Sequence, residues 1–77
     1  MDFEDYETAE GEMCLSIKAR CIRESPKALL VRIEGETEPV WLPKSQVKDE
    51  SEVFAEGHDG ELVLSRWICK EKGWIDE

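Results

Sequence analysis

The chain has 77 residues and a formal net charge of −9, with three cysteines and one histidine. A chain this short forms a single small domain, in which one core supplies only roughly 3–5 kcal/mol of stability without further help. The cysteines form no C-x-x-C pair, and no apolar stretch reaches the ~18 residues of a membrane span, so we expect no metal, no cofactor and no membrane segment.

The first twelve residues carry six acidic side chains and no base. Their apolar content is too low to offset the entropy of ordering the chain, so residues 1–12 are predicted to be a disordered acidic tail. Phe3 and Tyr6 are spaced so that they would lie together if this segment became helical on a partner. A tail that only adds solubility explains the same composition.

Two runs of alternating residues follow the tail. In MCLSIKARCIR, every second residue is apolar or small, which is typical of a half-buried strand; these residues are Met13, Leu15, Ile17, Ala19 and Cys21. ESPK then supplies a turn and ALLVRIEG repeats the alternation, so an antiparallel hairpin is predicted. The hairpin is basic, with five bases against one acid in residues 13–33, whereas residues 34–61 carry nine acids against two lysines.

A third strand is predicted in the run EPVWLPKSQV. Val40 and Leu42 would face the core and Trp41 the opposite side. Pro43 has no N–H to donate, so the ladder should end there, and PKSQ should form a single turn before Val47 resumes an extended course.

The last third of the chain combines a loop, a strand and a helix. Residues 48–56 have little apolar pattern and are expected to form a loop or a short edge strand. GHDG is a turn signal, and ELVL predicts a last strand whose two leucines, Leu62 and Leu64, point inward. Ser65 suits the N-cap of a helix over residues 66–72.

The predicted helix has to dock on the sheet, because two turns are not stable alone. Trp67 and Ile68 are expected to make this contact. Gly73 suits the left-handed position after a helix end, and Trp74 can pack back on Ile68 or Cys69.

These elements predict an α+β fold for residues 13–77: one small domain with a curved antiparallel sheet of three to five strands, closed like a barrel or half-closed, and one short C-terminal helix across its core face. Cys14 and Cys21 would lie on one strand, roughly 23 Å apart and beyond disulfide reach. With Cys69 they are predicted to be reduced, which indicates a cytoplasmic protein, and the acidic N-terminus does not look like a signal peptide.

No catalytic arrangement can be recognised, so the protein is not expected to be an enzyme. His58 lies alone in a turn, and neither Ser45 nor Ser65 has a histidine in a suitable arrangement. Glycine-rich phosphate-binding loops are absent from the sequence.

Two binding hypotheses remain. In the first, carboxylates contact a basic surface on another protein and a tryptophan anchors the contact; the candidate residues are Glu34, Glu36, Glu38, Trp41, Asp49, Glu50 and Glu52. In the second, a basic strand face with an aromatic side chain binds single-stranded nucleic acid; the candidates are Lys18, Arg20, Arg32, Trp41 and Lys44. The net charge favours the first. Trp41 could equally belong to the core or to a homodimer interface.

Two motifs resemble a known pattern. The run Trp41–Val47, WLPKSQV, and the later run Trp67–Gly73, WICKEKG, resemble a W-[ILV]-P-K-S-Q-[IV] segment and a C-terminal W-[IL]-x-x-E-K-G helix shared by many small uncharacterised proteins of phages, prophages and other mobile elements. The resemblance covers roughly residues 13–74 and implies provenance, since the family has no activity to carry over. Small acidic proteins of this origin often resemble antagonists of host defence, including nucleic-acid mimics that occupy the basic groove of a nuclease or CRISPR complex. The expected function is therefore a non-catalytic, protein-binding accessory factor of this kind.

Overall fold

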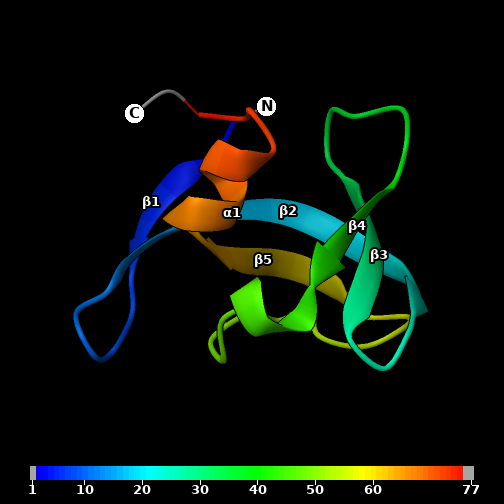
Figure 1. Ribbon diagram of the computed structural model, residues 1–77, viewed down its shortest axis with the longest axis horizontal. Coiled ribbons are helices and arrows are strands. Elements are labelled where there is room, and N and C mark those ends of the chain that lie inside the picture. The colour runs from blue at the N-terminus through cyan, green and yellow to red at the C-terminus, as the bar shows by residue number, and fades with distance from the viewer. Residues whose placement is uncertain (1, 76–77) are drawn as a thin grey trace.

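The computed structural model describes residues 2–75 as an open antiparallel sheet of five strands with one short helix near the C-terminus (Figure 1). The elements in chain order are β1 (Glu4–Glu7), β2 (Met13–Glu24), β3 (Ala28–Ile33), β4 (Val40–Pro43), the 3-10 helix η1 (Lys44–Gln46), β5 (Asp59–Ser65) and α1 (Arg66–Glu71). The predicted α+β class is confirmed. The sheet does not close into a barrel.

Strand β2 organises the sheet because it is twelve residues long and pairs with three other strands. One edge of β2 pairs first with β1, from Glu7↔Met13, and further along with β3, from Ala19↔Ile33. The opposite edge pairs with β5 over seven residues. Figure 1 shows β2 as a curved strand that crosses the whole molecule.

The core lies on one side of this sheet. The predicted inward residues of β2 from Leu15 to Cys21 are buried, as are the two leucines of the last strand. Met13 is an exception, since it lies at the end of β2 opposite exposed Glu7 and is 47% exposed. The prediction that it points into the core was wrong for this residue.

The predicted ESPK turn joins β2 to β3. The backbone N–H of Ser25 donates to the carbonyl of Ala28, and the Ser25 hydroxyl accepts from the Ala28 N–H at 3.0 Å. A bulge between Cys21 and Arg23 shifts the register of the two strands. As a result Arg23 lies opposite Leu30 on the outer side of the sheet.

The run PKSQ forms a single turn, as predicted. Pro43 is the last residue of β4, η1 follows it directly, and Val47 then bridges to Leu64 of β5. Residues 48–58 form a loop without a strand, and Val53 within this loop is fully buried in the core.

The loop after η1 covers the free edge of β5. The backbone N–H of Lys48 donates to the Val63 carbonyl, and the N–H of Glu52 donates to the Glu61 carbonyl. The buried Ser51 hydroxyl accepts from the Val63 N–H at 3.2 Å. These bonds satisfy backbone groups that an uncovered edge would leave open to another chain.

Helix α1 begins at its predicted N-cap, where the Ser65 hydroxyl accepts from the Ile68 N–H at 3.2 Å. Ile68 and Cys69 are buried, but Trp67 is 57% exposed, so the prediction that Trp67 docks the helix was wrong. A six-residue helix buries one narrow side, and Ile68 with Cys69 fills it. Gly73 has φ +76°, as expected for the residue after a helix end.

The N-terminal segment is ordered where the sequence predicted a disordered tail. Residues Glu4–Glu7 pair with β2, and Phe3 stacks on Trp74 with ring centroids 5.5 Å apart. An ion pair joins Asp5 to Arg66 at 3.6 Å. Backbone pairing with an available edge and one aromatic contact supply the stabilisation that the composition of the segment did not suggest.

Within residues 2–75, no helix is long and apolar enough to cross a membrane.

Candidate functional site

The side of β2, β3 and β4 that faces away from the core presents a group of basic and apolar side chains that we call the outer sheet face. Strand alternation places them there because their neighbours in each strand point into the core. The face comprises Lys18, Arg20, Arg23, Leu30, Arg32 and Trp41.

Trp41 is the largest apolar side chain on this face and is 46% exposed. Its partner across the strand pair is Leu30, which in turn lies opposite Arg23. Leu42 beside it is fully buried and Val40 packs against the core, so Trp41 faces outward, as predicted.

Two arginines lie directly opposite each other on the outer sheet face. Arg20 of β2 pairs with Arg32 of β3, and like charges at such positions are destabilising. Within residues 2–75, neither guanidinium takes part in an ion pair, although Arg32 Nη1 donates to the Thr37 carbonyl at 3.1 Å. Asp59 lies opposite Arg20 on the β5 side and offsets part of the charge. Hollows of about 250 and 430 Å³ border the two arginines.

The predicted acidic residues fall into two separate groups. Glu34, Glu36 and Glu38 lie in or beside the exposed loop between β3 and β4, next to the strand that carries Trp41. The loop with Asp49, Glu50 and Glu52 lies on the other side of the molecule (Figure 1). Only the first group therefore lies in a loop that is directly connected to the strand of Trp41.

Part of the second acidic group makes contacts within the protein. Glu50 accepts from the backbone N–H of Ala9 at 2.9 Å, and Glu52 accepts from the N–H of Glu61 at 2.8 Å. Asp49 is exposed. Two of these three carboxylates thus hold loops in place, in addition to any role in binding.

Lys44, a candidate for nucleic-acid binding, lies beyond the end of β4 and not on a strand of the outer sheet face. It follows Pro43 in η1 and forms an ion pair with Glu24 at 2.5 Å. The hydrogen bond from Lys44 holds the pKa of the Glu24 carboxyl below its ordinary value, helped by the bond from the Glu56 N–H. Lys18, Arg20, Arg32 and Trp41 remain together on the outer sheet face.

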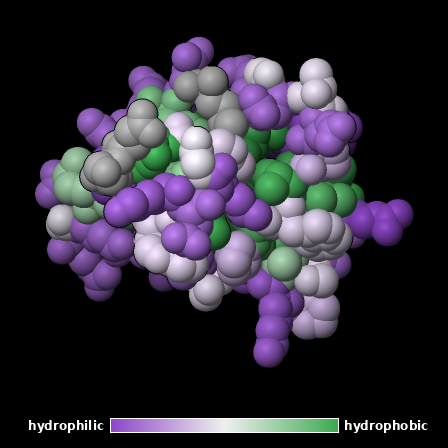
Figure 2. Space-filling model, turned by 45° about the horizontal axis from the view of Figure 1, so that its top comes forward, coloured by the Kyte–Doolittle hydropathy of each residue, from purple (hydrophilic) through white to green (hydrophobic). Residues whose placement is uncertain are grey.

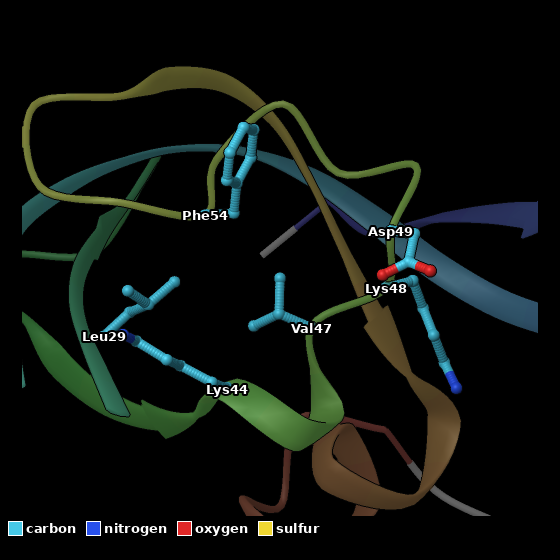
Figure 3. Close-up of a pocket in the computed structure, with 6 residues that line it drawn as sticks. All are labelled: Leu29, Lys44, Val47, Lys48, Asp49 and Phe54. Carbon is cyan, nitrogen blue, oxygen red and sulfur yellow. The ribbon is translucent and has the colours of Figure 1, made fainter. Parts of the chain in front are cut away.

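Sequence reasoning did not identify Phe54 as an exposed apolar side chain. Phe54 is 58% exposed, and the pattern of residues 48–56 offered no way to decide its direction. Figure 2 shows hydrophobic residues gathered on the side of the molecule where β3 and β4 lie, within a surface that is otherwise mainly hydrophilic. Figure 3 shows Phe54 facing Val47 and Leu29 across a hollow.

The three cysteines are free and buried, as predicted. Burial raises the pKa of the Cys14 and Cys21 thiols, and it raises the pKa of Cys69 to about 11. Such thiols stay protonated near neutral pH, and the thiolate is the reactive form, so they are poor nucleophiles. Across residues 2–75, no group of three or more His, Cys, Asp and Glu side chains is arranged to hold a metal ion.

Comparisons of the chain with protein-family models, with curated proteins and with solved structures found no match.

Proposed function

We propose that this protein is a non-catalytic, protein-binding accessory factor whose contact surface is centred on Trp41. The half-exposed indole on an open sheet face carries this proposal. Exposed tryptophans and arginines are the residues that most often dominate binding energy at protein interfaces. Trp41 has Leu30 and Arg32 within the same hairpin, so it can anchor a contact of both apolar and polar character.

The acidic β3–β4 loop gives this surface a preference for a basic partner. Its three glutamates are exposed in the segment that leads into the strand of Trp41, in a protein of net charge −9. Exposed charges of one sign raise the association rate with a surface of the opposite sign. The partner we propose has a basic groove into which the carboxylates fit.

The proposed source rests on the motif resemblance, and the proposed target rests on an analogy with other small acidic proteins of that origin. The W-L-P-K-S-Q-V and W-I-C-K-E-K-G runs support a phage or mobile-element protein, and the small acidic domain supports an inhibitor of a host defence complex of the CRISPR or nuclease type. In this role the carboxylates act as a mimic of DNA phosphates. Three free cysteines fit a cytoplasmic location.

The test is inhibition of DNA cleavage by defence complexes purified from a host. The protein should inhibit one such complex, and Trp41→Ala or the triple reversal of Glu34, Glu36 and Glu38 to lysine should weaken inhibition at least ~10-fold, which is about 1.4 kcal/mol of binding.

The control variant carries Glu4→Lys, Glu7→Lys and Glu71→Lys, which change the net charge by the same amount at other exposed positions. It should inhibit as the wild type does. The proposed surface would be contradicted if the Trp41→Ala protein inhibited as strongly as the wild type. It would also be contradicted if the control variant lost as much inhibition as the variant with Glu34, Glu36 and Glu38 reversed.

A second candidate function is single-stranded nucleic-acid binding, and the Arg20–Arg32 pair is the observation that favours it. Two guanidiniums beside an exposed tryptophan match the combination of phosphate contact and base stacking that single strands require. Anisotropy of a fluorescent single-stranded DNA at low salt should then increase with the wild type and not with Arg20→Gln/Arg32→Gln. A Lys27→Gln/Lys72→Gln protein is the charge-matched control. An unchanged anisotropy with the wild type would exclude this candidate.

A further inference from the structure

A second surface lies on the other side of the β3–β4 strand pair from Trp41, around the loop that follows η1. A hollow of about 370 Å³ opens there, and its walls are Leu29, Val47 and Phe54 with Lys44, Lys48 and Asp49 at the rim. Figure 3 shows Phe54 and Leu29 on opposite sides of the open space, with the Val47 side chain pointing into it. This volume is in the range of sites that enclose an apolar group.

Phe54 is held in place as a wall of this hollow although it is 58% exposed. The His58 ring lies edge-on to it, with centroids 4.4 Å apart and planes at 73°. The Phe54 N–H also points to His58 Nδ1 at 3.4 Å. The supported Phe54 ring and the partly buried Val47 are therefore the apolar groups that a ligand in this hollow can contact, with the buried Leu29 behind them.

A second hollow of about 240 Å³ adjoins the first across residues 47–49, which line both. Its other walls are the β1–β2 turn, Ser45 and Glu50. The two hollows together carry two lysines against four carboxylates, Glu10, Glu12, Asp49 and Glu50.

The lysines do not make the region basic, because each already has an acidic partner. Lys44 pairs with Glu24, and Lys48 pairs with Glu12 at 2.8 Å. The charge left at the surface is that of the carboxylates Glu10, Asp49 and Glu50. An apolar hollow therefore lies directly beside an acidic one.

We propose that the hollow walled by Phe54 takes one apolar side chain of an extended segment of a partner protein, and that the adjoining acidic hollow takes a lysine or arginine next to it in that segment. The inference rests on the proposed function only in that the partner is a protein. The site is separate from the outer sheet face, so one protein could contact a partner at two places.

The test uses a capped heptapeptide, Lys-Arg-Gly-Trp-Gly-Arg-Lys, and NMR titration of the full-length protein. We expect saturable binding below ~1 mM, about 4 kcal/mol, with the largest shifts at Leu29, Val47, Asp49 and Phe54. Phe54→Ala should weaken binding at least ~10-fold without a change in melting temperature, because this side chain is mostly exposed. Glu10→Lys/Asp49→Lys should weaken it as strongly, and replacement of the peptide's Trp by Ala should abolish it.

Two variants separate this inference from the proposed function. Trp41→Ala and the triple reversal of Glu34, Glu36 and Glu38 should bind the peptide as the wild type does. Loss of peptide binding in Trp41→Ala with retention in Phe54→Ala would overturn the inference while leaving the outer sheet face in place. Absence of binding at several millimolar peptide, or shifts confined to other residues, would overturn it as well.

Discussion

At the scale of single residues, the two tryptophans near the C-terminus have opposite roles. Trp74 stacks on Phe3, and its backbone N–H donates to the Cys69 carbonyl at 2.9 Å, whereas Trp67 is mostly exposed. Trp74 therefore ties the N-terminal segment to the end of the helix. The sequence suggested a docking role for both.

Replacement of each tryptophan by alanine tests this assignment. Trp67→Ala should change the free energy of unfolding by less than about 0.5 kcal/mol, as surface changes do. Trp74→Ala should cost about 1–3 kcal/mol, since it removes an aromatic pair and buried apolar area. Urea denaturation of both variants checks the prediction, and the reverse order of losses would contradict it.

The buried thiol of Cys69 predicts a loss of stability at alkaline pH. Its pKa is raised from 9.0 to about 11, mainly by desolvation, so the folded state favours the neutral form. The stabilisation is complete below about pH 9 and decreases as the pH rises toward 11. The urea midpoint should fall between pH 8 and pH 10.5, and it should fall less in Cys69→Ala. An equal fall in both proteins would show that this thiol has no part in it.

At the scale of elements, the sequence predicted the strands and turns well where one local rule decides. The alternation in β2, the proline at the end of β4 and the serine cap of α1 each act within a few residues, and each is found. The element that was not predicted, β1, depends on contacts with residues far away in the sequence. β1 is stabilised by pairing with β2 and by the ion pair with Arg66, and Phe3 before it stacks on Trp74; none of these contacts can be predicted from residues 1–12 alone.

The same limit applies to the candidate site. Alternation was enough to predict that Trp41 and the bases of β2 and β3 share a face. The bulge at Cys21/Arg23, which adds Arg23 to that face, and the hollow beside Phe54 arise from tertiary packing. The separation of the two acidic loops is also a property of the fold.

Strand β1 provides a direct test of order in the N-terminal segment. Backbone order parameters of Glu4–Glu7 should be near ~0.85, as in rigid structure, and those of a disordered tail would fall below ~0.6. Phe3→Ala should lower them, because the ring stacks on Trp74. Order parameters below ~0.6 in the wild type would instead support the prediction that residues 1–12 are disordered.

At the scale of the whole molecule, a homodimer through the outer sheet face stays a prediction, while dimers through sheet edges are disfavoured. The outer edge of β1 carries three acidic side chains, and β4 is four residues long and ends in a proline. Sedimentation at tens of micromolar should show a monomer or a dimer that Trp41→Ala dissociates. A dimer unaffected by Trp41→Ala would place the contact elsewhere.

The central claim is that Trp41 and the β3–β4 carboxylates contact a basic protein surface. The most direct measurement is the association rate between this protein and the defence complex that it inhibits, followed as a function of salt concentration. Reversal of Glu34, Glu36 and Glu38 should slow association and flatten its salt dependence, while Arg20→Gln/Arg32→Gln should not slow it, because this change removes two positive charges that repel a basic partner from the outer sheet face. If the arginine variant alone loses association, and the glutamate variant associates as fast as the wild type at every salt concentration, the claim is contradicted.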